Sequence, residues 1–211
     1  MKNNSAALYK NEQKYYADGV KTIAGIDEVG RGSWAGPLVV GIVIFPKNYC
    51  NKEINDSKKL SRVKRDELYK QIKKHAIFSQ TIFITADEID DTNNIKTSTK
   101  IAMIKLIKQS KSKADKYLVD GEKLAIDNID TKEFIKGDEK FQCIAAASII
   151  AKVERDRYMI DLAKIYPRYG FEKHVGYGTE LHKKAIDKFG IIPHIHRMTF
   201  APIKSKTTQI K

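Results

Sequence analysis

Residues 22–46 read TIAGIDEVGRGSWAGPLVVGIVIFP, and this stretch decides how the rest of the chain is interpreted. Short runs of β-branched and other apolar residues that are bounded by glycine and proline predict strands. The stretch therefore predicts two strands joined by a glycine-rich turn. Two adjacent carboxylates, Asp27 and Glu28, stand at the end of the first apolar run, directly before the turn.

The turn itself contains Gly30, Arg31 and Gly32. Neighbouring residues on a strand point to opposite faces, so Asp27 and Glu28 share a side only where the strand ends or twists. Glycine permits such a change of direction. Backbone N–H groups in a turn of this kind, with an arginine beside them, can hold a phosphate or a sugar. Carboxylates would repel an anion bound at this turn unless a cation lies between them. The alternative interpretation of the stretch is an ordinary polar hairpin end.

Two later acids repeat this design. Residues 117–121, YLVDG, predict a short strand that ends in Asp120 and a glycine, and a predicted strand over residues 131–136 is followed by a glycine and Asp138. At 4 Å and an effective dielectric constant of about 20, two like charges repel by about 4 kcal/mol. If the four acids meet, they need cations among them or must take up protons. Oxygen-only ligands favour Mg²⁺ or Mn²⁺, and two such ions suit phosphodiester hydrolysis.

The chain resembles the ribonuclease HII family, a type 2 ribonuclease H. Residues 25–37, GIDEVGRGSWAGP, are similar to the first signature of that family, with Ser33 where the family more often has proline. The later signatures occur in the family's order over about residues 22–200. They are NDSKKL at 55–60, VDG at 119–121, GD at 137–138, IAAASIIAKV at 144–153, GYGT at 176–179 and HR at 196–197.

The resemblance implies an α/β fold: a ribonuclease H-like mixed sheet of about five strands, flanked by helices, with a helical C-terminal portion. It also implies an endonuclease that cuts the RNA strand of RNA–DNA hybrids, and cuts 5′ of single ribonucleotides in duplex DNA, leaving 5′-phosphate and 3′-hydroxyl ends. Two Mg²⁺ or Mn²⁺ ions are the expected cofactors. The expected catalytic and metal-binding residues are Asp27, Glu28, Asp120 and Asp138. The expected substrate-binding residues are Gly30, Arg31, Gly32, Lys58, Ser148 and Tyr177.

Two other functions are considered. A ribonuclease HIII-like enzyme is disfavoured, because that family carries a long extra N-terminal domain and a different residue at the position of Arg31. A nucleic-acid-binding module without catalysis is disfavoured, because all four acids are present. Taken without the resemblance, Lys58 reads as part of a solvated helix start and Tyr177 as a loop anchor.

Other charged groups favour structural roles. The acids at 87–91 are typical of a helix start, although a metal site is the alternative. Asp156 has an arginine on either side in the sequence, so we expect it to form a structural ion pair; a metal-related role is the alternative. His194 and His196 are expected in packing and surface roles. Helices are predicted over residues 62–74, 95–109, 143–166 and 180–188. Ser61 and Thr179 are the expected caps of the first and last, and Val63, Leu68 and Ile72 are expected on the buried side of the first. Pro167 is expected to stop the third helix, whose alanines can approach another element closely.

The composition sets limits on the partners. Lys and Arg number 39 against 26 for Asp and Glu, a net charge of +13 that suits a polyanion such as nucleic acid. No apolar run reaches the roughly 18 residues that span a bilayer, and we expect no membrane partner. Without a signal core, and with Cys50 and Cys143 far apart, a cytoplasmic protein with reduced thiols is predicted, acting as a monomer. The predicted regions are an N-terminal extension (1–20), a catalytic domain (21–202) and a basic tail (203–211).

Overall fold

The computed structural model describes residues 5–207. The chain forms two compact units: one comprises the residues up to 28, 40–82 and 100–153, and the other comprises 29–39, 83–99 and the residues from 154 onward. The elements in chain order are α1 (Ser5–Ala17), β1 (Ile23–Val29), β2 (Leu38–Ile44), η1 (Ser57–Lys59), α2 (Arg62–His75), β3 (Phe78–Ile84), α3 (Ala86–Thr92), α4 (Ile95–Gln109), β4 (Lys116–Asp120), β5 (Asp130–Phe134), η2 (Gly137–Glu139), α5 (Gln142–Ile165), α6 (Phe171–His174), α7 (Glu180–Phe189) and α8 (Ala201–Thr207).

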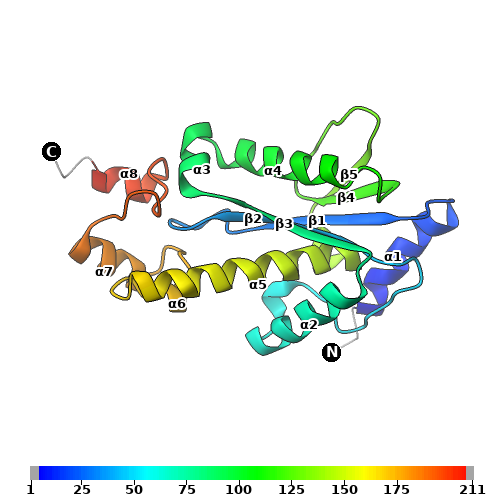
Figure 1. Cartoon of the computed structure of the whole chain (residues 1–211), viewed down its shortest axis with the longest axis horizontal. Helices are drawn as coiled ribbons and strands as arrows, with labels where there is room; N and C mark the ends of the chain where they lie inside the picture. The colour runs from blue at the N-terminus through cyan, green and yellow to red at the C-terminus, as the bar shows by residue number, and fades with distance from the viewer. Residues whose placement is uncertain (1–4, 208–211) are drawn as a thin grey trace. The chain divides into compact units, whose positions relative to one another are not determined.

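The strands form one five-stranded mixed sheet in the order β3-β2-β1-β4-β5 (Figure 1). β1 pairs with β4 in parallel, and β4 pairs with β5 in parallel. Every residue of β2 is buried, which fits its continuous run of apolar side chains. The predicted α/β fold with a mixed sheet is confirmed. Among residues 5–207 no helix is long and apolar enough to cross a membrane.

Helix α2 begins where its sequence predicts. The Ser61 hydroxyl accepts a hydrogen bond from the Lys64 amide at 3.2 Å, as expected of an N-cap residue. Leu68 and Ile72 are fully buried and join a core cluster with the first part of α5. The prediction that Val63 shares this buried side is wrong, because 70% of it is exposed. Val63 and Leu68 are five positions apart, so their side chains point about 140° apart around the helix axis.

The alanine-rich start of α5 packs directly on the sheet, as the sequence suggests. A Cβ atom at Gly25 in β1 would lie 2.1 Å from the carbonyl carbon of Cys143 and 2.3 Å from the Ile144 amide nitrogen. Gly41 in β2 faces the Ala147 carbonyl oxygen in the same way, at 2.5 Å. Strand and helix backbones are therefore in contact, with no room for a side chain between them.

Gly25→Ala is expected to lower the free energy of unfolding by at least about 1–3 kcal/mol, the cost of overpacking a dense interior. The atoms in the way belong to the backbone, so no side-chain rotation relieves the clash. Chemical denaturation followed by circular dichroism measures the change. Gly32→Ala is the control, because a Cβ there meets nothing within 4 Å. An equal midpoint for Gly25→Ala and the wild type would contradict the close approach.

The N-terminal helix is tied to α5. Glu12 in α1 is 2% exposed, and its Oε1 accepts a hydrogen bond from the Cys143 amide at 2.7 Å, at the first turn of α5. Burial raises the pKa of Glu12 to about 7, with the amide hydrogen bond opposing that rise. Tyr16 is buried in a core cluster that includes Cys143, and Tyr9 and Tyr15 pack against that cluster. The extension thus has a defined packing role, which its polar sequence leaves open.

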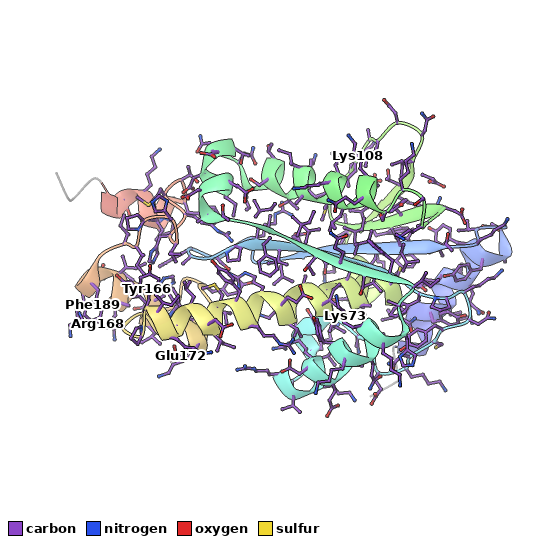
Figure 2. All side chains as sticks on the ribbon, viewed as in Figure 1. Lys73, Lys108, Tyr166, Arg168, Glu172 and Phe189 are labelled. Atoms are coloured by element: carbon purple, nitrogen blue, oxygen red, sulfur yellow. The ribbon has the colours of Figure 1, made fainter. Side chains whose placement is uncertain are left out.

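The second unit has its own core. Met159, Phe171 and Ala185 are among its buried residues, and the ring of Tyr169 stacks on Phe171 at 5.6 Å between centroids. In the same unit the Arg168 guanidinium lies 5.6 Å from the centroid of Phe189 (Figure 2). The lysine- and threonine-rich sequence after Pro202 predicts a disordered or loosely attached tail. Residues 201–207 instead form α8, in which Ile203 is fully buried. Residues 208–211 lie outside the described part of the chain.

Candidate active site

The register of two strands places two of the predicted acids side by side. Ile26 of β1 pairs with Val119 of β4, and the residues that follow are Asp27 and Asp120. Neighbouring strands lie about 4.8 Å apart, and parallel strands end at the same edge of the sheet. Both carboxylates therefore stand at that edge. The two acids are 93 positions apart in the chain, so only the strand pairing makes them neighbours.

The other predicted acids lie around this pair. The Gly137 amide donates a hydrogen bond to Asp120 Oδ1 at 2.6 Å, which fixes η2 and its Asp138 beside the end of β4. Glu28 follows Asp27 in β1, and its amide donates to Asp27 Oδ1 at 2.7 Å. Asp27 and Asp138 are each 4% exposed, while Glu28 and Asp120 are half-buried. The first unit thus brings Glu28, Asp120 and Asp138 within electrostatic range of Asp27.

Burial and mutual repulsion make the ionised state of this cluster unfavourable. Burial raises the pKa of Asp27 well above its usual value, and the negative charges of Glu28, Asp120 and Asp138 raise it further. A hydrogen bond with Ser148 opposes this rise. Burial also raises the pKa of Asp120, against the opposing hydrogen bond from the amide of residue 137. Positive charge placed among these oxygens would stabilise their ionised forms.

Lys58 supplies one positive charge to the cluster. Its Nζ lies 3.5 Å from Asp138 Oδ2, and its side chain is 82% exposed. Burial lowers the pKa of Lys58, but the charges of Asp138, Asp56 and Asp27 outweigh that effect and raise it. Asp56 caps η1 by accepting from the Lys58 amide at 2.9 Å. The predicted phosphate-contacting lysine thus lies beside the acids and is open to solvent.

Ser148, predicted to bind substrate, is 2% exposed in this structure. Its hydroxyl lies 3.0 Å from that of Ser57, at the start of η1, and it hydrogen-bonds Asp27. Ser148 therefore links α5, η1 and β1 inside the first unit. Its role toward substrate stays a prediction.

The acids suit a hard divalent ion by the chemistry of their donors. All four side chains offer only carboxylate oxygens, which select Mg²⁺ or Mn²⁺ over softer ions. Within the described range of the chain, no three His, Cys, Asp or Glu side chains are gathered closely enough to hold an ion as they stand. The carboxylate oxygens are therefore of the type that the expected metal prefers. In this structure the side chains do not stand close enough together to surround an ion.

The glycine-rich turn lies in the second unit and is anchored by Arg155. Gly30 adopts a φ of +95°, and a Cβ there would lie 2.2 Å from Arg155 Nε, so only glycine fits. Ser33 stands where the related family more often has proline. Its hydroxyl accepts from Arg155 Nη2 at 2.8 Å, and it is fully buried. This hydrogen bond ties the turn down without the stiff ring of proline.

The loop that carries Tyr177 meets this turn. Ser33 and Tyr177 form an isolated antiparallel bridge, and the Trp34 amide donates to the Gly176 carbonyl at 2.8 Å. The Arg155 guanidinium lies 5.4 Å from the centroid of the Tyr177 ring. The predicted sugar-reading groups, from sequence segments more than 140 residues apart, are therefore neighbours within the second unit.

The remaining charged groups have structural partners. Thr85 and Glu88 form a capping box at the start of α3, so the acids at 87–91 begin a helix, as expected. Asp90 accepts hydrogen bonds from the Met198 amide at 2.7 Å and the Thr199 amide at 3.0 Å. Exposed His194 pairs with Asp87 at 2.9 Å, consistent with a surface role.

Sequence reasoning missed the roles of three residues in the second unit. Arg155 and Arg197 are fully buried and donate to loop carbonyls, whereas the sequence suggested only an ion pair with Asp156 for Arg155 and no particular role for Arg197. His182 is fully buried as well, although its place in a polar helix start gives no signal of that. The burial of each depends on loops distant in sequence, so a local pattern does not reveal it.

The five-stranded mixed sheet and its helices have the fold of known ribonuclease H2 structures. The structure is similar to the ribonuclease H2 of Pyrococcus horikoshii OT3, with a TM-score of 0.72 and 24% identity over 89% of this chain and 98% of that one. It is also similar to an RNase HII of Archaeoglobus fulgidus, which was solved in complex with PCNA. The TM-score is again 0.72, with 29% identity over 84% of this chain and 94% of that one.

Sequence comparison specifies the family. The model of the ribonuclease HII family matches residues 24–203. The ribonuclease HII of Endomicrobium trichonymphae is 42% identical over 205 residues, which cover 97% of each chain. The chain belongs to the ribonuclease HII family. Its activity is that of a ribonuclease HII: a metal-dependent endoribonuclease whose substrates are RNA–DNA hybrids.

Proposed function

We propose that Asp27, Glu28, Asp120 and Asp138 hold two Mg²⁺ or Mn²⁺ ions and that this edge of the sheet is where the RNA strand is cut. The observation that carries the proposal is the parallel register of β1 and β4, which sets Asp27 beside Asp120, with the amide of residue 137 fixing η2 against them. When bound, such ions activate a water molecule and stabilise the leaving oxygen of a phosphodiester.

The chain's own groups position the substrate in this proposal. Lys58, exposed and beside Asp138, neutralises a phosphate next to the scissile bond. The net charge of +13 holds the rest of the duplex without reading its sequence. Each of the four acids comes from this one chain, which supports action as a monomer.

The turn at Gly30, Arg31 and Gly32, together with Tyr177, is proposed to read the ribose. Proteins distinguish RNA from DNA through the 2′-hydroxyl. Gly32 is exposed, and its backbone is open to a ligand because a Cβ there meets no atom within 4 Å. A site that recognises one ribose at a junction also accepts a single ribonucleotide in duplex DNA. We therefore propose cleavage 5′ of such a nucleotide, leaving 5′-phosphate and 3′-hydroxyl ends.

The deciding experiment uses a labelled DNA duplex with one embedded ribonucleotide, and a matched RNA–DNA hybrid. Each is incubated with the full chain in Mg²⁺, in Mn²⁺ or with a chelator, and the products are mapped by gel. Metal-dependent cleavage 5′ of the ribonucleotide is expected. Cleavage of the hybrid alone would overturn the single-ribonucleotide assignment, and retention of the duplex without any cleavage would favour a binding module.

Tyr177→Ala is expected to slow cleavage at a single ribonucleotide more than cleavage of a long hybrid. Aromatic stacking on a nucleotide is worth about 1–3 kcal/mol, or roughly 5–150-fold, and a long hybrid offers many alternative contacts. Steady-state kinetics on both substrates measure the ratio. Tyr158→Ala is the control, since this tyrosine of α5 is 42% exposed and its ring lies against that of Phe83, with centroids 5.9 Å apart. An equal loss on both substrates would count against reading of the junction by Tyr177.

A further inference from the structure

Three buried histidines of the second unit surround the backbone of the Tyr177 loop. His182 and His196 are fully buried, and His174 is 6% exposed. The rings of His174 and His182 stack with centroids 4.4 Å apart and an interplanar angle of 15°. The Nε2 atoms of His182 and His196 lie 3.1 Å apart. None of these side chains has a part in the proposed chemistry, so their arrangement asks for another explanation.

The fixed donor of the Ile192 amide determines the tautomer of His196. That N–H lies 2.8 Å from His196 Nδ1, so Nδ1 accepts and carries no proton. The Ile192 carbonyl also lies 3.3 Å from Nδ1, but a proton on Nδ1 would set that N–H against the Ile192 N–H. The ring proton of neutral His196 is therefore on Nε2, where it faces His182.

The tautomer of His182 follows from that of His196. Since His196 donates from Nε2, His182 Nε2 must accept, and the proton of neutral His182 is on Nδ1. That atom lies 3.0 Å from the Tyr177 carbonyl oxygen, which is a fixed acceptor. One directed chain of hydrogen bonds thus runs from the Ile192 amide through two imidazoles to the backbone of Tyr177.

His174 braces the same loop from the other side. The Gly176 amide donates to His174 Nδ1 at 3.2 Å, so the proton of this ring is on Nε2, which donates to the Tyr169 carbonyl at 2.9 Å. The Tyr177 amide donates to the His174 carbonyl at 2.9 Å. The backbone N–H and the carbonyl of Tyr177 are therefore both held by histidine residues.

The loop has to be held because its backbone is strained. Val175 adopts a φ of +43° and Gly176 a φ of +84°. A β-branched residue in the left-handed region is a rare conformation that costs roughly 1–3 kcal/mol and persists only when its surroundings impose it. Without these restraints the loop would relax, and the ring of Tyr177 would move with it.

We propose that His182 and His196 are positioning residues for Tyr177, acting as a directed relay of neutral imidazoles that holds the loop over residues 175–178 in the conformation that reads a ribose. The inference rests on the proposed role of Tyr177. It assigns to two histidines outside the acid cluster a specific effect: discrimination between single ribonucleotides and long hybrids, not the rate of hydrolysis itself.

The surroundings keep the relay neutral at physiological pH. Burial lowers the pKa of both His182 and His196 to about 4, and the hydrogen bonds to backbone groups oppose that change. Among the described residues, the ring of Tyr169 packs against that of His196 with centroids 5.7 Å apart, and the negative charge of Glu172 on α6, labelled in Figure 2, acts on His174. A second proton on His182 would occupy Nε2 and face the Nε2–H of His196. A second proton on His196 would occupy Nδ1 and face the Ile192 N–H.

The relay is tested first without substrate. The chain has 5 histidines, so long-range ¹H–¹⁵N spectra of the full protein at pH 7 resolve each imidazole. Neutral Nδ1–H is expected for His182, and neutral Nε2–H for His174 and His196. An Nε2–H form of His182, or a charged ring at either relay position, would overturn the proposal. Because no substrate is present, this result does not depend on the proposed role of Tyr177.

Substitutions then test the effect on the substrate. His182→Leu removes the relay, whereas His182→Asn retains an amide donor near the position of Nδ1. His182→Leu is expected to lower kcat/KM at a single ribonucleotide by up to about a hundredfold relative to a long hybrid, as misplacement by about 1 Å can do. His182→Asn is expected to restore most of this loss. His194→Asn is the control, since this histidine is exposed and contacts Asp87.

The outcomes separate the two proposals. If the wild type discriminates through Tyr177 and a folded His182→Leu does so equally well, the relay is refuted and the role of Tyr177 stands. If Tyr177→Ala leaves discrimination intact, the role of Tyr177 fails, whatever the spectra show. Should His182→Leu not fold, His196→Gln, which retains a donor near Nε2, and His196→Leu provide the same comparison; equal discrimination by these two would refute the relay.

Discussion

Asp120→Asn is expected to reduce metal-dependent cleavage of an RNA–DNA hybrid by at least about a hundredfold, the order of loss when one group of a preorganised catalytic set is removed. Asparagine keeps the oxygen that accepts from the amide of residue 137 at 2.6 Å, so the end of β4 stays in place. It removes the charge that stands beside Asp27. Binding of the duplex is expected to be retained, because a polyanion gains nothing from that carboxylate.

Cleavage rates in Mg²⁺ and in Mn²⁺, together with gel-shift affinities, measure the two effects. Asp130→Asn is the matched control: Asp130 begins β5, pairs with Lys116 and stands at the opposite end of the paired strands. It is expected to retain wild-type activity. Full activity of Asp120→Asn would remove this carboxylate from the site, and an equal loss in Asp130→Asn would show a general effect on the sheet.

The same substitution has a pH-dependent effect on stability. Burial raises the folded-state pKa of Asp120, with Asp138 adding to the rise, so ionisation as pH increases costs the folded state more than the unfolded state. The stability that this group contributes below its unfolded pKa is lost as pH rises through the folded pKa. In a chelator, Asp120→Asn is therefore expected to melt higher than the wild type at pH 8, with a smaller difference at pH 4.

Arg155→Met is expected to lower the free energy of unfolding by about 3–5 kcal/mol, because it leaves several buried acceptors without donors and each such loss costs roughly 1–3 kcal/mol. The guanidinium is fully buried and donates to the carbonyls of Pro37 at 2.8 Å and Val175 at 2.9 Å. It also donates to Ser33 Oγ at 2.8 Å. Methionine fills much of the space but leaves these acceptors without donors.

Thermal unfolding is the measurement, with an expected drop in Tm of roughly 6–20 °C for a chain of this size. Arg157→Met is the control, since Arg157 is exposed two positions along the same helix. Arg155→Lys is also expected to destabilise, because one ammonium group cannot replace the planar fork of donors. An unchanged Tm in Arg155→Met would mean that the loop carbonyls find other partners and that the anchor is dispensable.

Local patterns in the sequence predict much of the fold. Residues 95–109 form a helix with the predicted bounds, and α5 ends at Ile165, two positions before Pro167, which is expected to stop it. Capping by Ser61 and Thr179 is confirmed. The failures are of two kinds. Val63 is exposed because it lies about 140° around the helix from Leu68, which the spacing of the two residues already implies. The chain after Pro202 is helical through residue 207, with Ile203 fully buried, and that packing is not visible in the local pattern.

The sequence by itself determined that the candidate acids lie at or near the ends of strands: Asp27 and Glu28 are within the last three residues of β1, Asp120 is the last residue of β4, and Asp138 follows β5 by four positions. These features depend on a few consecutive residues: a β-branched run, a carboxylate and a glycine. Only the tertiary structure decided that Asp27 and Asp120 are neighbours, because that depends on the pairing of β1 with β4. It likewise decided that Arg155 and His182 are buried, because their partners are backbone groups of loops whose paths no local pattern specifies.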